Sequence, residues 1–332
     1  MKKHVMVGPK TSVWQDVPMV ELRDEKDIIV KLQYCGVCMS EHYRFEVGKA
    51  GDTLGHEPYG IVYAVGSEVK NVKVGDRVSG LFPGSAEYVN TRENRIFVIP
   101  DSISDEDALL EPLACLMSAV SKVRIAMIGE KVAVVGCGYM GCGAISLLKM
   151  RSAYVVAVDI RRECLEDAKR YGADEVYTPD ELPEEYFDIP GKSLSFASAG
   201  NGFSLVMEWG ETAESLDLAL RMTRMRGQLA VGAYHTGEGR MVDMQQMNVK
   251  AIDCLSTHPR EFDMNRTGCE RAIKMLDDGR WNFKNIPVKV YPYTQIDRAQ
   301  SELTEKYGKY MKAIIDYRVC DGEPYILNGE QK

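Results

Sequence analysis

Residues 35–43, CGVCMSEHY, place thiol, hydroxyl, carboxylate, imidazole and phenol side chains in one short segment. The spacing of Cys35 and Cys38 fits half of a structural zinc site, a redox dithiol, or one edge of a catalytic metal site. No second Cys-x-x-Cys occurs in the sequence, which argues against a paired structural site. Zinc also accepts imidazole and carboxylate ligands, and a catalytic site keeps one position open for water or substrate. Further candidate ligands are His56 and Glu57 in LGHEPYG and Glu111 in LLEPLAC.

A second motif, VVGCGYMG, places Gly136, Gly138 and Gly141 after a predicted buried strand and at the start of a predicted helix. The first glycine allows a tight turn, the second lets the backbone approach a pyrophosphate, and the third lets helix and strand pack closely. The helix N-terminus offers free N–H groups to the phosphates. Asp159 ends the next predicted strand, where a carboxylate hydrogen-bonds ribose hydroxyls. The pattern predicts a dinucleotide site, and its other candidate residues are Tyr139, Met140 and Arg161.

The residues around Asp159 bear on the choice of dinucleotide. The carboxylate repels a 2′-phosphate, whereas Arg161 and Arg162 could attract one. Because the acid occupies the ribose position and the arginines follow it, we expect NAD rather than NADP.

The elements that must position these residues change in character along the chain. Up to about residue 100, short apolar runs are separated by Gly, Asn and Pro, which is typical of an antiparallel, barrel-like unit. Residues 104–123 have a helical pattern that opens with serine and acidic residues. Strands and helices then alternate, as in a parallel sheet with helices on both faces. The tail from residue 285 returns to strand, helix and strand, and could rejoin the first unit.

Size and composition limit the possible functions. A chain of 332 residues, 45% hydrophobic and 27% charged, can form two domains or one large one. The net charge of -8 and the absence of a long basic run argue against a nucleic-acid partner. No apolar stretch reaches the roughly 20 residues that a membrane span needs. Nine cysteines without a signal-peptide pattern predict reduced thiols in the cytoplasm.

Several motifs in order carry a resemblance to a known family: CGVCMSEHY, GHEPYGIVYAVGSEVKNVKVGDRV, AEYV, EPLA and VAVVGCGYMG followed by VVAVD. Over nearly the whole chain the sequence resembles the medium-chain zinc-dependent alcohol and polyol dehydrogenases. The resemblance implies an α/β protein with two domains. A GroES-like, β-rich catalytic domain would comprise residues 1–108 and 284–332, and a Rossmann domain with a doubly wound parallel sheet would comprise residues 109–283.

The resemblance also implies the metal ligands. Cys38 matches the family's zinc cysteine, His56 its zinc histidine, and Glu57 the neighbouring acid that serves as a second-shell or transient ligand. Glu111 matches the third ligand of the sorbitol-dehydrogenase-like branch, whereas the simple-alcohol branch uses a cysteine, for which Cys115 is the competitor. The lobe with four cysteines that binds a structural zinc in many relatives has no counterpart after GDRV, so we expect one catalytic zinc per chain.

The proton relay departs from the family pattern. Ser40 fits the relay hydroxyl, but the acid that follows is Glu41 instead of the usual aspartate. Tyr43 occupies the usual place of the relay histidine, and His42 precedes it. Either His42 reaches the relay or Tyr43 and water carry the proton, and both stay candidates.

The predicted activity is hydride transfer between NAD and a secondary hydroxyl of a polyol, sugar or related alcohol. The alternatives are a dehydrogenase of simple or amino alcohols and a zinc-free quinone or enone reductase on the same fold; a non-enzymatic protein is disfavoured because Ser40 and the zinc ligands are retained. The expected partner is a small hydroxylated substrate, with no nucleic acid and no membrane. The resemblance further implies a homodimer or homotetramer.

Overall fold

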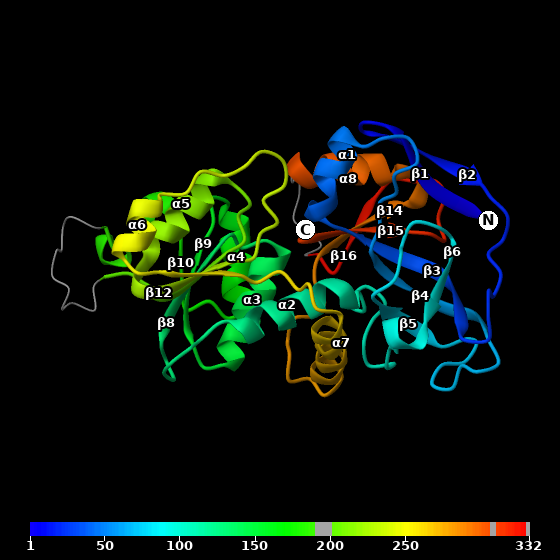
Figure 1. Ribbon diagram of the computed structural model, residues 1–332, viewed down its shortest axis with the longest axis horizontal. Helices are drawn as coiled ribbons and strands as arrows, with labels where there is room; N and C mark the ends of the chain where they lie inside the picture. Colours follow the sequence, from blue (N-terminus) through cyan, green and yellow to red (C-terminus); the bar gives the residue numbers. More distant parts are fainter. Residues whose placement is uncertain (190–200, 306–309, 330–332) are drawn as a thin grey trace. The chain divides into compact units, whose positions relative to one another are not determined.

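The computed structural model describes residues 1–189, 201–305 and 310–329, and the chain divides into two compact units (Figure 1). Unit 1 contains Met1–Ala114, Glu261–Arg280 and Lys284–Lys332, and unit 2 contains Cys115–Arg260 and Trp281–Phe283. The division falls within helix α2 (Leu110–Lys122). Within the described residues, no helix combines the length and the apolar character needed to cross a membrane.

Unit 1 is built on a β sheet of eight strands in the order β16-β14-β15-β3-β4-β5-β7, with β6 paired to β3 off this path. Its strands are β3 (Asp27–Val37), β4 (Glu57–Val65), β5 (Arg77–Gly80), β6 (Tyr88–Arg92), β7 (Ile96–Val98), β14 (Val288–Pro292), β15 (Lys312–Asp316) and β16 (Tyr325–Leu327). A separate hairpin comprises β1 (Lys2–Gly8) and β2 (Thr11–Asp16). Strand β15 pairs antiparallel with β3, so the tail rejoins the first unit as predicted.

Unit 1 also contains the helices α1 (His42–Val47), α7 (Phe262–Asp277) and α8 (Ile296–Glu305). Short 3₁₀ helices of the described chain are Met39–Glu41, Glu93–Arg95, Pro179–Glu181, Glu184–Tyr186 and Tyr293–Gln295. The core of unit 1 gathers apolar side chains from both ends of the chain, among them Ile28, Leu32, Tyr291 and Ile315.

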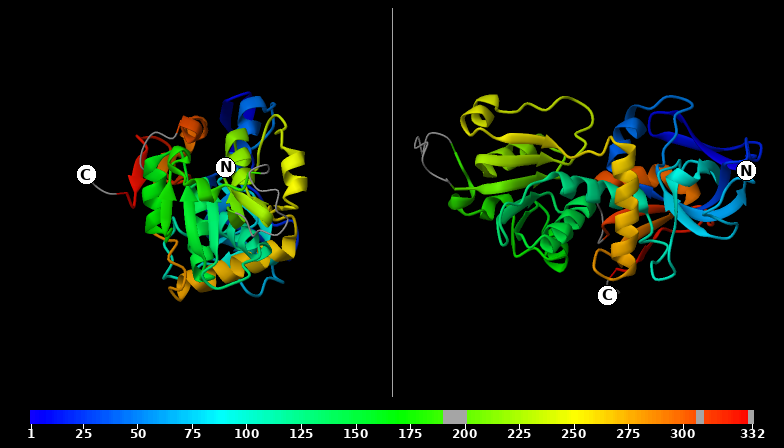
Figure 2. Two further views of the ribbon diagram at one scale, coloured as in Figure 1. Left: turned by 90° about the vertical axis from the view of Figure 1, so that its left-hand side faces the viewer. Right: turned by 60° about the horizontal axis from the view of Figure 1, so that its bottom comes forward.

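Unit 2 contains a parallel sheet of six strands in the order β10-β9-β8-β11-β12-β13. The strands are β8 (Lys131–Val135), β9 (Tyr154–Val158), β10 (Glu175–Tyr177), β11 (Phe203–Glu208), β12 (Thr223–Val231) and β13 (Asp253–Ser256). Its helices α3 (Tyr139–Met150), α4 (Arg162–Arg170), α5 (Ala213–Met222) and α6 (Met244–Val249) lie on both faces of the sheet (Figure 2). This is the doubly wound order, in which strand order reverses beside β8.

Local sequence explains where the helices of unit 2 begin. Thr212 accepts a hydrogen bond from Ser215 N and forms a capping box at the start of α5. Asp243 accepts from Gln246 N in the same way before α6. Each side chain satisfies a backbone donor that has no partner inside the helix.

The units differ from the predicted domains in two segments, residues 109–114 and 261–280. Residues 109–283 were expected to form the Rossmann domain, but α7 and the start of α2 lie in unit 1. Contacts within unit 1 explain this placement. A Cβ at Gly268 of α7 would lie 2.9 Å from Ala114 O, and Cys269 Sγ lies 3.9 Å from Leu110 O. The close approach that Gly268 permits buries α7 against the beginning of α2.

Glu175 of strand β10 lies at the centre of a cluster of tyrosine side chains in unit 2. Glu175 accepts hydrogen bonds from Tyr154 (2.7 Å), Tyr177 (2.7 Å) and Tyr186. Lys131 Nζ lies 3.2 Å from the same carboxylate. Burial would raise the pKa of Glu175, but the hydrogen bonds from the three phenols and Lys131 outweigh it and lower this pKa to about 2.

We expect Glu175→Gln to lower the melting temperature at pH 7. Because the pKa of Glu175 is lower in the folded state, its stabilisation is present above the unfolded pKa of about 4.3 and disappears as pH falls towards about 2. The difference in melting temperature between wild type and variant should therefore shrink between pH 7 and pH 3, as followed by circular dichroism. Glu184→Gln, at an exposed position nearby, is the control, and an equal difference at both pH values would contradict the prediction.

Candidate active site

The pairing of β3 with β4 brings the first group of candidate metal ligands together. Gly36, near the end of β3, pairs with Glu57 at the start of β4. Cys38 follows β3 and His56 precedes β4, so the antiparallel register places them side by side. The ligand atoms of Cys38, His56 and Glu57 lie within 4.8 Å of one another, the one such group of ligand atoms in the described part of the chain. Thiolate, imidazole and carboxylate together match the donors that zinc accepts.

A buried acid fixes the orientation of the candidate histidine ligand. Glu41 Oε1 lies 2.8 Å from His56 Nδ1, and the same carboxylate accepts from Gly55 N at 2.9 and 3.1 Å. Because a carboxylate only accepts, Nδ1 carries the proton of the neutral ring and Nε2 keeps the lone pair. Glu111 Oε2 lies 4.0 Å from Nε2, on the metal-binding side of the ring. A carboxylate behind the imidazole is the usual support of a metal-bound histidine.

Negative groups surround His56. Burial would lower the pKa of His56, but hydrogen bonds with Cys38 and Glu41 and their negative charge raise it above its usual value. An excess of negative charge around one imidazole is the electrostatic environment that a cation would stabilise.

Glu57 has a buried partner from the far end of the chain. Lys312 Nζ lies 2.7 Å from Glu57 Oε1 and 2.6 Å from Oε2, and the two side chains are 8% and 1% exposed. Burial lowers the pKa of Lys312, but the charge of Glu57 raises it on balance. A Cβ at Gly36 would lie 1.8 Å from Glu57 Oε2, so the glycine makes room for this carboxylate. The arrangement holds the Glu57 side chain in place beside Cys38 and His56.

The two candidates for the third protein ligand lie on one helix. Glu111 is in the first turn of α2 and belongs to unit 1, together with His56. Cys115 follows one turn later, is partly buried and belongs to unit 2. Proximity to His56 supports Glu111, and the assignment of the third ligand stays a proposal.

The candidate relay residues have different surroundings. Ser40 Oγ donates to Cys38 Sγ at 3.3 Å, which places a hydroxyl beside the candidate thiolate. His42 begins α1, and its Nε2 lies 3.6 Å from Glu46 Oε1 one turn along the same helix. Tyr43 is 46% exposed. The structure thus places the serine at the site, while both proposed successors in the relay stay open.

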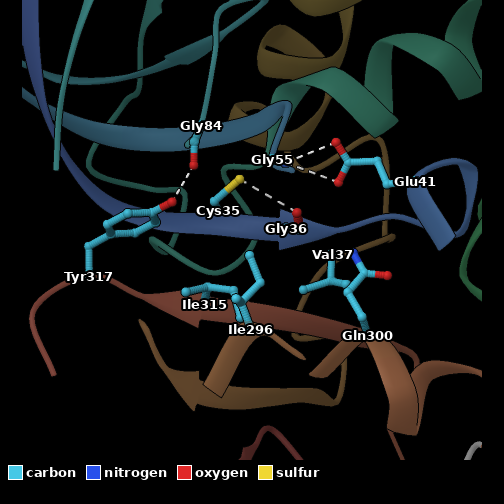
Figure 3. A pocket seen from close by; sticks show the side chains of 10 residues that line it. All are labelled: Cys35, Gly36, Val37, Glu41, Gly55, Gly84, Ile296, Gln300, Ile315 and Tyr317. Carbon is cyan, nitrogen blue, oxygen red and sulfur yellow. Dashed lines mark hydrogen bonds between the residues drawn. The ribbon is translucent and has the colours of Figure 1, made fainter. Parts of the chain in front are cut away.

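Cys35 lies in the core of unit 1, which does not suit the metal-ligand or redox role that its spacing from Cys38 suggested. Its side chain is 2% exposed, lines a small cavity with Gly55, Gly84 and Tyr317, and contacts Gly36 O (Figure 3). Burial raises the pKa of the thiol to about 12, so the thiolate that a metal or a redox dithiol needs is disfavoured. Cys35 therefore acts as a small apolar residue of the core.

The glycine loop of unit 2 has the shape that a dinucleotide needs. Gly136 adopts φ +91°, and a Cβ there would lie 2.6 Å from Gly210 N. A Cβ at Gly141 would lie 1.9 Å from Gly136 O. Gly138 is the residue before α3, and a Cβ placed there would have no protein atom within 4 Å. Because glycine has no side chain, it also leaves the first N–H groups of α3 without a side-chain cap. The loop therefore leaves open space at uncapped N–H groups, where a pyrophosphate fits. Tyr139 and Met140 form the first turn of α3.

Asp159 connects this loop to the candidate ribose position. Its Oδ2 accepts from Cys137 N at 2.7 Å, and its Oδ1 accepts from Arg161 N at 2.9 Å. Arg161 Nε lies 3.4 Å from the same oxygen. Arg162 instead pairs with Glu181 at 2.7 Å. Both arginine side chains thus have carboxylate partners, which supports NAD over NADP.

The sequence did not predict two contacts of the candidate metal ligands, that of Glu41 with His56 and that of Lys312 with Glu57. Glu41 was noted only as a longer acid in place of aspartate, and the support that it gives His56 depends on the β3–β4 register. Lys312 lies far from the motifs, and no local pattern links it to Glu57.

We expect Glu41→Gln to weaken zinc affinity by about 10- to 100-fold, since loss of a carboxylate behind a histidine ligand has effects of this size. The measurement is competition with a chromogenic chelator. Glu46→Gln, on the adjacent helix, is the matched control, because Glu46 pairs with Lys10 at 2.9 Å and is partly exposed. Equal zinc affinity of wild type and Glu41→Gln would contradict the prediction.

Comparisons with known proteins agree with this fold and site. The alcohol dehydrogenase GroES-like domain matches residues 24–101, and the zinc-binding dehydrogenase family matches residues 140–270. The chain belongs to the medium-chain zinc-dependent alcohol and polyol dehydrogenases. The predicted fold class is thereby confirmed.

Within that family, the chain is similar to proteins named for sugar and polyol substrates. It is 26% identical over 351 residues to a probable D-xylulose reductase A of Neosartorya fischeri, covering 94% of this chain and 95% of that protein. It is 27% identical over 344 residues to D-arabitol-phosphate dehydrogenase of Enterococcus avium, covering 91% and 92%. The structure of L-idonate 5-dehydrogenase from Escherichia coli has the same fold, with a TM-score of 0.77 and 19% identity over 95% and 98% of the two chains.

Proposed function

We propose that this protein is a zinc-dependent oxidoreductase that transfers a hydride between NAD and a secondary hydroxyl of a polyol, sugar or related alcohol. The observation that carries the proposal is the cluster of Cys38, His56 and Glu57, with ligand atoms within 4.8 Å of one another. The names of the relatives support the substrate class, since xylulose, arabitol phosphate and idonate all carry several hydroxyl groups.

Cys38, His56 and Glu111 would hold the zinc, with Glu57 as the acid beside it. When bound, zinc would supply Lewis-acid polarisation of the substrate hydroxyl, and NAD would accept the hydride. Glu41 keeps His56 Nε2 directed at the metal position. Lys312 holds the Glu57 carboxylate beside the metal position through a buried ion pair.

Proton transfer from the substrate begins at Ser40. Its hydroxyl donates to Cys38 Sγ in the structure, and to act as the relay it would turn this proton outward while it accepts the proton of the substrate. The next acceptor is His42 or Tyr43 with water. His42 is mostly buried and adjoins Glu46, and Tyr43 reaches solvent directly, so each offers a route to bulk water.

In unit 2, the residues bind and orient the dinucleotide. The open space at Gly138 admits the pyrophosphate, and Asp159 receives the adenosine ribose hydroxyls. Arg162 pairs with Glu181 at the surface, so a 2′-phosphate would have to compete with this carboxylate. A homodimer or homotetramer in the cytoplasm is part of the same proposal.

The test combines metal analysis with a substrate panel. Purified full-length protein is expected to contain about one zinc per chain and to reduce NAD with pentitols, hexitols or their phosphates more efficiently than with ethanol or amino alcohols. Chelation should abolish activity, and added zinc should restore it. Protein without stoichiometric zinc and with activity insensitive to chelators would refute the proposal, and higher catalytic efficiency with NADP would refute the cofactor assignment.

The third ligand has its own test. We expect Glu111→Ala to lose zinc and activity with the polyol panel, while Cys115→Ala, one turn along α2, retains both. Zinc content by mass spectrometry decides between the two residues. The reverse result would assign the thiolate as third ligand and favour a simple or amino alcohol as substrate.

A further inference from the structure

A histidine–glutamate pair in unit 2 has no role in the reaction proposed so far. Glu208 ends β11 and is fully buried, and its Oε2 lies 2.9 Å from His235 Nε2. His235 follows β12, and its side chain is 13% exposed. Both residues lie just beyond the carboxyl ends of neighbouring parallel strands, where open sheets of this kind bind their ligands.

Backbone contacts join the pair to the glycine loop. Trp209 N, next to Glu208, donates to Val135 O at 2.7 Å, and Val135 directly precedes Gly136. A Cβ at Gly136 would lie 2.7 Å from the carbonyl carbon of Trp209. On the other side, Gly232 N donates to Glu208 O at 2.9 Å. The pair is therefore built into the rim of the dinucleotide site.

The sheet order indicates which half of the dinucleotide faces the pair. Asp159, the candidate partner of the adenosine ribose, follows β9 on one side of β8. Glu208 and His235 follow β11 and β12 on the opposite side of β8. Because a dinucleotide crosses the sheet at this reversal of strand order, the β11 and β12 side receives the nicotinamide half.

Hydrogen bonds fix the carboxylate and thereby the imidazole. Glu208 Oε1 accepts from Gly210 N (2.8 Å), Glu211 N (3.0 Å) and Ser215 Oγ (2.7 Å), which leaves Oε2 for His235. Since the carboxylate only accepts, Nε2 carries the proton of the neutral ring, and Nδ1 is an acceptor. Among the described residues, the buried Nδ1 has no hydrogen-bond partner. Buried polar atoms are nearly always paired, and this one has an acceptor lone pair that a donor group of a ligand at the rim could use.

The loop after β11 and the loop after β12 each contain a residue in an unfavourable backbone conformation close to the pair. His235 has φ +48° and Glu211 has φ +64°, although neither is glycine. Thr236 Oγ1 donates to Glu211 Oε1 at 3.1 Å and ties the loops together. Such conformations persist where the surroundings enforce them, and here they keep the imidazole in place.

We propose that His235, oriented by Glu208, binds the nicotinamide half of the dinucleotide by accepting a hydrogen bond at Nδ1 from its ribose hydroxyl or carboxamide N–H. The inference rests on the proposed function, because it requires that unit 2 binds a dinucleotide. His235 is thus a positioning residue for the group that exchanges hydride.

The test compares three ligands by isothermal titration calorimetry on the full-length protein: NADH, ADP-ribose and AMP. His235→Gln keeps an amide that can reach Glu208 but removes the acceptor at Nδ1. We expect this variant to bind NADH about tenfold more weakly, the size of one lost hydrogen bond, with AMP affinity and melting temperature unchanged. Weaker binding of ADP-ribose would identify the ribose hydroxyl as the donor, and unchanged binding would identify the carboxamide.

Glu211→Gln is the matched control, because the amide oxygen of glutamine can still accept the hydrogen bond from Thr236 Oγ1, so that the tie between the loops, the imidazole and Glu208 stay in place. It should leave the ratio of NADH affinity to AMP affinity unchanged. Unaltered NADH affinity in His235→Gln, or an equal loss for NADH and AMP with a lower melting temperature, would overturn the inference and leave the proposed function standing. A wild-type protein that binds neither NADH nor AMP would remove both.

Discussion

Replacement of Cys38 by serine is expected to abolish stoichiometric zinc binding and to lower kcat/KM for the best polyol by at least about 1000-fold, since Lewis-acid polarisation contributes several kcal/mol to such reactions. Cys38 supplies the one thiolate of the cluster with His56 and Glu57. A hydroxyl in its place is a poor zinc ligand at neutral pH because it keeps its proton. Serine nearly preserves the volume of cysteine, so the fold should persist.

Metal content, steady-state rates and circular dichroism together test this expectation. Cys320→Ser is the control, since Cys320 is an exposed cysteine of the same unit. It should retain zinc, rate and melting temperature. A Cys38→Ser protein that keeps a full complement of zinc and most of its activity would show that the zinc is bound elsewhere.

The second large effect is expected at the glycine loop. In Gly141→Ala, the new methyl group would lie 1.9 Å from Gly136 O, and backbone would have to move to accept it. A shift of about 1 Å in a positioning element can lower a reaction rate about 100-fold, so we expect kcat/KM to fall by at least this factor and NADH affinity to fall with it. The melting temperature should also fall, because the helix can no longer approach the strand as closely.

Fluorescence titration with NADH measures the affinity directly. Gly138→Ala is an informative comparison, because its Cβ would meet no protein atom within 4 Å, and the fold should tolerate it. The methyl group would instead project into the space proposed for the pyrophosphate. Loss of NADH binding with an unchanged melting temperature in Gly138→Ala would support that placement, whereas NADH affinity near wild type in Gly141→Ala would contradict the role given to this loop.

The shape of the glycine loop was predictable from sequence because its requirements are local. A strand, three glycines, a helix and an acid occur in order, and each step depends on neighbours in the chain. The structure gives Gly136 and Gly141 the close contacts, Gly136 the positive φ and Gly138 the open space that this pattern requires.

The candidate metal site was predictable only in part. Motifs identified Cys38, His56 and Glu57, but the partner of each depends on strand register and on distant segments. Glu41 reaches His56 because β3 and β4 pair as they do, and Lys312 reaches Glu57 from 255 positions away. The place of α7 could not be predicted for a similar reason: helical periodicity defines an apolar face but not the surface that covers it.

The pairing of Glu57 with Lys312 has a consequence for biosynthesis. A ribosome releases the N-terminal strands long before the segment that carries the lysine, and until then the acid has no counter-charge. An unpaired carboxylate in an apolar interior is strongly unfavourable, and β3 also lacks its neighbour β15 at that stage. Unit 2 can fold while the chain is growing, but unit 1 becomes complete only after strand β15 has been synthesised.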